Sequence, residues 1–124
     1  MAKLLENNTL NELQTQVFNE AMTYVATVDE QGNPQLAPKG SLKVLDDKHL
    51  IFIEYSYGHT YENIKANGKV AASAWGLESK KAFRVEGKAT LQKDTDFANE
   101  YLAGTGREND VVTIIEIERI YALN

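Results

Sequence analysis

Apolar and polar side chains alternate without a break along Phe83-Arg84-Val85-Glu86-Gly87-Lys88-Ala89-Thr90-Leu91. Successive side chains of a β-strand point to opposite faces, so this period of two predicts a strand with one buried face and one polar face. The buried face would carry Phe83, Val85, Gly87, Ala89 and Leu91. Such a strand needs a sheet whose other strands bury the same side, and the flanking sequence supplies them.

Further strands are predicted on both sides of this segment, where β-branched and aromatic residues run between turn residues. The segment from Asp29 to Pro34 contains Gly32 and Asn33, which favour turns, and it predicts a hairpin. A second turn is predicted at Asp46-Asp47-Lys48. The expected strands cover Met22–Val28, Gln35–Lys39, Ser41–Leu45, Leu50–Tyr55, Val70–Trp75 and Val111–Tyr121.

The first of three short helices is predicted near the N-terminus. Thr9-Leu10-Asn11-Glu12 fits a capping box, with Thr9 as the N-cap and the Glu12 side chain reaching back to it. Leu10, Leu13 and Val17 then recur at helical spacing. This pattern predicts an amphipathic helix over about residues 10–20.

Two more helices are predicted between the later strands. One runs from about His59 to Ala66, where Asn67-Gly68 is a typical C-terminal stop. Asp94 is the predicted cap of the other, in which Phe97 and Tyr101 lie one turn apart and pair. Both helices are too short to form a layer of their own, so we expect them at the edges of the sheet.

About six strands with short helices at the edges indicate a mainly β fold, a six-stranded antiparallel barrel that forms one domain over residues 1–124. The last strand is apolar on both faces through Val111–Ile115. The second face of such a strand needs a cover, and a partner copy of the chain is the economical one. We therefore expect a homodimer whose interface contains this strand.

Composition excludes several classes of function. The chain has no cysteine and two histidines, which rules out thiol chemistry and makes a dedicated metal centre unexpected. Any redox chemistry would then come from a bound cofactor. The net charge of −5, without a basic stripe, argues against nucleic acid. No segment is typical of a signal peptide or a membrane span, so a cytoplasmic location is expected.

Ser56-Tyr57-Gly58-His59-Thr60 is the first candidate for ligand binding, because it lies between a predicted strand and the start of a predicted helix. The first amides of a helix lack partners and attract anions such as phosphate. Gly58 would let the backbone approach a ligand, while His59 and Thr60 offer polar side chains. The alternative is that Ser56 or Thr60 simply caps the helix.

Pro38-Lys39-Gly40-Ser41 is the second candidate. A glycine inside an extended stretch is typical of a bulge or of close approach by another group, and Lys39 could face a phosphate or a flavin carbonyl. The alternative is a kinked strand with a solvent-facing lysine. Trp75 is expected in the core or in a dimer contact. No Ser/His/Asp or paired-carboxylate arrangement is present, so no catalytic side chain is assigned.

These segments, in this order, resemble the FMN-binding split-barrel family, also called pyridoxamine 5'-phosphate oxidase-like. Within it the chain is most similar to the small FMN-binding proteins typified in sulfate-reducing bacteria. The resemblance runs from the strand at Met22 to Leu123. It is carried by residues 36–44, His59-Thr60-Tyr61-Glu62-Asn63-Ile64, Lys69-Val70-Ala71 and residues 83–89.

The resemblance implies a six-stranded split barrel that dimerises with FMN at the interface. It places the phosphate on His59 and Thr60, with Asn63 steadying that turn. The segment from Pro38 to Ser41 would pass the ribityl chain and the flavin ring. Ser56 and Tyr57 belong to the same expected cofactor site, and Leu123 would reach the partner's flavin.

Two departures from the family pattern shape the expected function. His59 stands where relatives usually carry lysine, so the charge at the phosphate site would depend on pH. The chain also lacks the arginine- and histidine-bearing C-terminal segment of true pyridoxamine phosphate oxidases, so oxidation of vitamin B6 is not expected. The main hypothesis is an FMN-dependent oxidoreductase or electron carrier. The alternatives are a non-enzymatic flavin- or haem-binding module, with His59 as the axial ligand of a haem, and a barrel that has lost its ligand.

Overall fold

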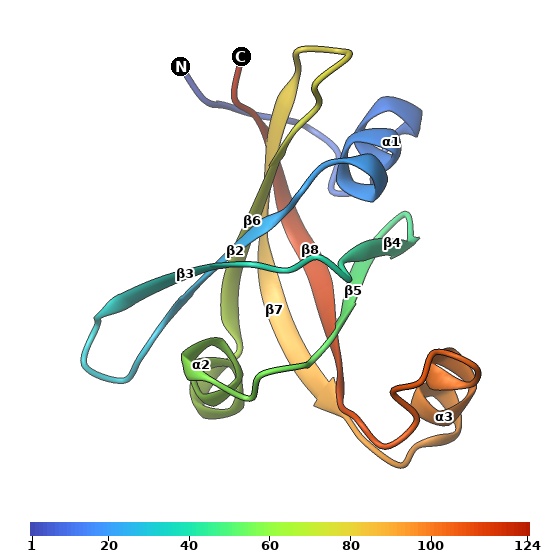
Figure 1. The fold of residues 1–124 in the computed structure, drawn as a ribbon. Helices are drawn as coiled ribbons and strands as arrows, with labels where there is room; N and C mark the ends of the chain where they lie inside the picture. The colour runs from blue at the N-terminus through green and yellow to red at the C-terminus, as the bar shows by residue number, and fades with distance from the viewer.

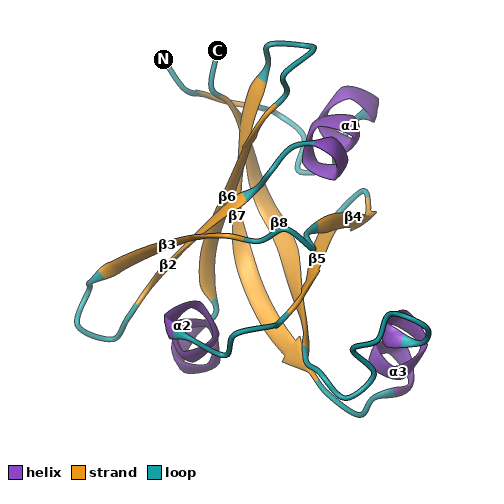
Figure 2. Ribbon diagram, viewed as in Figure 1, coloured by secondary structure: helices purple, strands orange, loops and turns teal.

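The computed structural model describes all of residues 1–124, which form one eight-stranded sheet and three short helices (Figures 1 and 2). The strands are β1 (Lys3–Leu4), β2 (Tyr24–Val28), β3 (Pro34–Pro38), β4 (Lys43–Asp46), β5 (His49–Ile53), β6 (Lys69–Trp75), β7 (Ala82–Gln92) and β8 (Val112–Ala122), and the helices are α1 (Glu12–Glu20), α2 (His59–Asn67) and α3 (Asp96–Leu102).

Neighbouring strands follow the order β3-β2-β6-β7-β8-β5-β4, with β1 added beside β8, and all pairs are antiparallel. The end strands β3 and β4 do not pair with each other, so the barrel is open. This confirms the mainly β, antiparallel split barrel. The strand count exceeds the expected six, and β1, with two residues, is too short to leave a periodic signal.

The alternation that predicted β7 is confirmed: Phe83, Val85 and Ala89 are buried in the main core. Gly87 lies at a register shift between β7 and β8, where the pairing moves from Glu86 with Arg119 to Gly87 with Ile117. A β-bulge of this kind bends the strand and increases its twist. It therefore helps the two longest strands to curve around the core, as Figure 1 shows.

Helix α1 begins two residues later than the predicted cap requires. The N-cap is Asn11 and not Thr9: the Asn11 side chain accepts the Gln14 N–H at 2.9 Å, and the Gln14 side chain accepts the Asn11 N–H at 2.9 Å. Leu10 precedes the helix because its N–H donates to the carbonyl of Asp47. Leu13 consequently points to solvent, and Val17 with Phe18 forms the buried face.

Helix α3 also has a different cap from the predicted one. Thr95, not Asp94, is the N-cap, and its hydroxyl accepts the Ala98 N–H at 3.0 Å. Asp94 adopts a φ of 58°, in the left-handed region, which turns the chain into the helix. The predicted aromatic pair is confirmed, since the rings of Phe97 and Tyr101 stack with centroids 6.1 Å apart.

The second face of β8 is covered within the chain. Val112 and Ile114 pack in a small second core with residues of β5 and with Ala98 and Leu102 of α3. Figure 1 shows α3 beside the start of β8. A partner copy was expected as the economical cover of this face, and α3 covers it within the chain instead. The homodimer itself remains a prediction. None of the three helices has the length and apolar character needed to cross a membrane.

Candidate functional site

The N-terminal end of α2 has no side-chain cap. Its N-cap is Gly58, and the first helical hydrogen bond runs from the Glu62 N–H to the Gly58 carbonyl at 3.0 Å. Neither Ser56 nor Thr60 caps the helix, so the capping interpretation is wrong. The amides at the start of a helix have no intrahelical partner and point toward any anion placed there. The helix end matches the prediction at Gly68, whose φ is 71°.

His59 opens α2 and lies on a hollow between this helix and the β2–β3 turn. The hollow has a volume of about 230 Å³ and is lined by Asp29, Asn33, Pro34, Gln35, His59 and Asn63. None of these side chains is strongly apolar, so the hollow suits a phosphate-sized polar group and not a flavin ring. Hydrogen bonds from the Asn33 side chain and backbone lower the pKa of Asp29, which therefore places a negative charge here at neutral pH.

Thr60 and Asn63 are buried on the inner side of α2. The Asn63 side-chain amide donates to the Thr27 hydroxyl at 3.0 Å, which fastens the helix to β2. Asn63 thus holds the helix in place, close to the steadying role that the resemblance implies. Thr60 is 3% exposed, so its hydroxyl is not open to an approaching ligand.

The Pro38–Ser41 segment is held against the end of β5. The Ser41 hydroxyl donates to the Ile53 carbonyl at 3.2 Å and accepts the Ile53 N–H at 2.9 Å. Both hydrogen bonds fix the segment beside the loop that leads to α2. Gly40 is exposed, and an added Cβ would meet nothing within 4 Å. No neighbouring protein atom therefore requires glycine at this position.

Lys39 is neither solvent-facing nor directed at an open anion site. Its Nζ lies 3.8 Å from Glu54 Oε1 and 5.4 Å from the centre of the Phe52 ring. The Lys39 side chain is 12% exposed and that of Glu54 is fully buried. Sequence reasoning missed Glu54 because it ends an apolar run. The sequence signal was the spacing of two residues from Phe52, which places Glu54 on the same face of the extended chain as Phe52.

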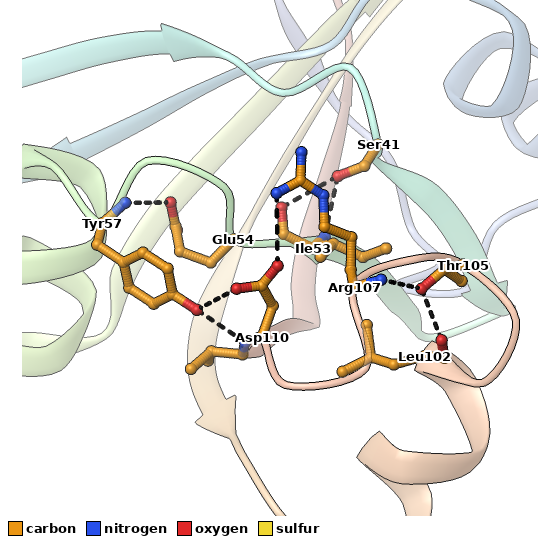
Figure 3. A network of polar contacts seen from close by, with 9 residues as sticks. Ser41, Ile53, Glu54, Tyr57, Leu102, Thr105, Arg107 and Asp110 are labelled. Atoms are coloured by element: carbon orange, nitrogen blue, oxygen red, sulfur yellow. Dashed lines mark hydrogen bonds and ion pairs between the residues drawn. The ribbon is translucent and has the colours of Figure 1, made fainter.

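Tyr57 joins the β5–α2 loop to the loop that follows α3 (Figure 3). Its hydroxyl donates to Asp110 Oδ1 at 2.8 Å and accepts the Val111 N–H at 3.2 Å. Burial raises the pKa of this hydroxyl, and the hydrogen bond to Asp110 raises it further. Arg107 lies 3.7 Å from Asp110 and stacks over the Tyr55 ring at 4.2 Å.

Five of the nine predicted site residues form two groups. Lys39, Ser41 and Tyr57 cluster at the end of β5, where each is engaged by a neighbour within the chain. His59 and Asn63 lie on the hollow beside the β2–β3 turn. The start of α2 joins the two groups. Pro38, Gly40 and Ser56 are exposed close to this junction, and Thr60 is buried in the first turn of α2.

An open antiparallel barrel with a helix terminus at its mouth defines the split-barrel class of cofactor-binding domains. The chain belongs to the pyridoxamine 5'-phosphate oxidase family, whose model matches residues 10–124. No protein of curated function matches the chain in sequence.

Two solved structures are similar in both sequence and fold. A candidate pyridoxamine 5'-phosphate oxidase from Lactobacillus delbrueckii is 43% identical, with a TM-score of 0.90 over 95% of this chain and 98% of the other. HupZ from Group A Streptococcus is 31% identical, with a TM-score of 0.82 over 92% of this chain and 94% of the other.

More distant structures share the fold alone. An FMN-binding protein from Syntrophomonas wolfei is 19% identical, with a TM-score of 0.69 over 89% of this chain and 83% of the other. The haem storage protein HutZ from Vibrio cholerae is 15% identical, with a TM-score of 0.67 over 83% and 87%. The same fold therefore occurs in proteins that handle different planar cofactors.

Proposed function

We propose that the chain is an FMN-binding protein that holds the cofactor phosphate at the N-terminal end of α2. The observation that carries the proposal is the uncapped helix terminus, with His59 exposed beside a hollow of about 230 Å³. Free amides, the helix dipole and a histidine that can be protonated all favour an anion. Membership of the pyridoxamine 5'-phosphate oxidase family supports FMN as the source of that anion.

The residues of the chain would bind and position the cofactor. The amides of His59 and Thr60 would hold the phosphate, and Ser56 would add a hydroxyl from the preceding loop. Asn63 keeps the helix against β2 through its bond to Thr27. The bound flavin would supply electron transfer, and we assign no catalytic side chain. We place this activity in the cytoplasm, as an oxidoreductase or an electron carrier.

Titration of the purified protein with FMN and with riboflavin, followed by flavin fluorescence and absorption, tests the proposal. A phosphate contact of charge-assisted strength is worth about 1.5–3 kcal/mol. FMN should therefore bind about tenfold or more tightly than riboflavin. Equal affinity for the two flavins would show that the protein does not contact the phosphate. Absence of binding by either flavin would reject the proposal.

Haem is a second candidate, favoured by His59. Its imidazole is exposed and makes no hydrogen bond within the chain, so it is free to ligate iron. A Soret band that follows addition of haemin and is lost in His59→Ala would support this candidate. A haemin spectrum identical in the two proteins would exclude His59 as a ligand.

Replacing His59 by lysine tests whether this side chain faces the phosphate. His59→Lys should tighten FMN binding above pH 7, because lysine keeps its charge where most histidines have lost theirs. The gain should shrink below about pH 6 and in high salt, since an exposed charge pair is screened. Affinity titrations of both proteins at two pH values measure it. A gain that is equal at both values would show that His59 does not face the phosphate.

We also propose that the protein works as a homodimer with the cofactor at its interface. Met22, Tyr24, Leu36, Trp75 and Leu77 are exposed, and we call them the apolar patch. They line a shallow hollow of about 590 Å³, in which eight of the ten lining residues are hydrophobic. Exposed apolar patches of this kind are typical of protein interfaces. A partner could also supply the apolar cover for a flavin ring that the hollow at His59 lacks.

Trp75 is the side chain whose loss should matter most for this dimer. It is 44% exposed, and buried tryptophans are often the residues that dominate an interface. Trp75→Asp should raise the dimer dissociation constant by about 30-fold or more, from a loss of about 2 kcal/mol. Analytical ultracentrifugation measures it, with Leu13→Asp on α1 as the control. A wild-type monomer at micromolar concentration, or equal effects of the two substitutions, would contradict the proposal that the apolar patch is the dimer interface.

A further inference from the structure

The buried carboxylate of Glu54 lies at the junction of the two segments that the proposed cofactor site needs. It follows β5 directly and precedes the loop to α2. Its Oε1 accepts the Tyr57 N–H at 3.2 Å and lies 3.8 Å from Lys39 Nζ. Its Oε2 is buried and has no partner. Figure 3 shows the side chain pointing from the loop toward Tyr57.

A fully buried carboxylate is costly unless a positive charge accompanies it. Lys39 is the countercharge here, and the Lys39 side chain is itself mostly buried. The pair therefore has no net charge, and its lysine is already engaged. Breaking such a pair by removing one partner is strongly unfavourable, because it leaves an uncompensated buried charge. A ligand phosphate would have to meet that cost to recruit Lys39.

We propose that Glu54 is a selectivity residue of the cofactor site, which withholds Lys39 from the ligand phosphate. The inference rests on the proposed function and deepens it. Phosphate binding then depends on the α2 amides and on His59. The carboxylate of Asp29 lines the same hollow and limits it further. The preference of the wild-type site for FMN over riboflavin should therefore stay at about tenfold, below the value that a free lysine at the phosphate would give.

Glu54→Gln tests the inference directly. Glutamine keeps an oxygen for the Tyr57 N–H and removes the charge that holds the lysine. The ratio of FMN to riboflavin affinity should rise about tenfold, the value of one new charge-assisted contact. Glu62→Gln is the matched control, because it removes an equal charge from the exposed first turn of α2. A ratio that is unchanged in Glu54→Gln, or raised equally in the control, overturns the inference.

The double variant Lys39→Gln/Glu54→Gln identifies the lysine as the cause. It contains no buried charge, so it should fold even where Glu54→Gln does not. The ratio of its FMN affinity to its riboflavin affinity should stay within about twofold of wild type. Two uncharged glutamines replace an ion pair whose charges already cancel, so no charge becomes available to the phosphate. A tenfold fall in the ratio would show that Lys39 already contacts the phosphate, which would also overturn the inference.

Inorganic phosphate separates this inference from the proposed function. Millimolar phosphate should raise the melting temperature of Glu54→Gln more than that of wild type or of the double variant. If no protein binds flavin, the proposed function fails, and the phosphate result still decides the role of Glu54. A shift confined to Glu54→Gln supports the withheld lysine, and equal shifts in the three proteins overturn it.

Discussion

Gly87→Ala is expected to destabilise the protein by more than about 3 kcal/mol, because the bulge between β7 and β8 leaves no room for a side chain. A Cβ on Gly87 would lie 1.9 Å from the carbonyl oxygen of Glu116 and 3.3 Å from the Cα of Ile117. Both contacts are with backbone, which cannot rotate away as a flexible side chain would. The two central strands would have to separate or lose their bulge.

Thermal unfolding by circular dichroism measures this effect. The melting temperature should fall by about 10 °C or more, given that 1 kcal/mol shifts a domain of this size by several degrees. Gly40→Ala is the matched control, because an added Cβ there meets nothing within 4 Å and should change stability by less than about 0.5 kcal/mol. A Gly87→Ala protein as stable as this control would contradict the close packing at the bulge.

The same control reports on the cofactor. If the Pro38–Ser41 segment passes a bound flavin, Gly40→Ala should leave folding intact and weaken flavin binding. Glycine at an exposed position with space around it has no role in packing, so any loss of affinity would come from the ligand. This makes Gly40 the clearest position at which to separate ligand contact from stability.

Local patterns predicted the elements that depend on local physics. The alternation in Phe83–Leu91 identifies β7, and Asn67-Gly68 ends α2 because glycine adopts the left-handed conformation at low cost. The start of α1 was harder. Thr9 and Asn11 are both good caps, and the choice depends on the bond from Leu10 to Asp47, a distant loop residue. Sequence spacing alone carries no information about that bond.

The candidate site was predicted in part for the same reason. A strand followed by Gly58 and a polar helix start is a local signal, and the structure keeps that terminus uncapped. The environment of Lys39 depends on Glu54, fifteen positions further along the chain, and on how the segment after β3 packs against the end of β5. The local sequence around Lys39 therefore does not show that this lysine forms an ion pair. The position of Glu54, two residues after the buried Phe52, is the sequence signal that would have identified it as the ion-pair partner of Lys39.

The cover of β8 shows why a correct local observation did not identify the element that supplies the cover. Val111–Ile115 is buried on both faces, as its composition predicted. Composition does not say which element supplies the cover. Helix α3 has only seven residues, and Leu102 at its end is fully buried because the helix packs against Ile51 and Val112. A short helix was therefore sufficient where a second subunit was expected.

Leu102→Ala should consequently lower the free energy of unfolding by about 2–5 kcal/mol, the usual cost of a buried leucine with its cavity. The Leu102 carbonyl also accepts the Thr105 hydroxyl and the Thr105 N–H at the start of the loop that carries Asp110. Loosening α3 should therefore weaken the bond from Asp110 to Tyr57 and reduce flavin affinity as well (Figure 3).

Denaturant unfolding and flavin titration of Leu102→Ala measure the two effects together, with Glu100→Ala on the exposed side of α3 as the control. The control should change both quantities by less than about 0.5 kcal/mol. A different outcome would be informative about assembly. If Leu102→Ala leaves the stability of the subunit unchanged and dissociates the dimer, then β8 and α3 form the interface and the apolar patch does not. If it destabilises the subunit and leaves the dimer intact, α3 acts as the internal cover of β8, and Trp75 in the apolar patch is the expected interface residue.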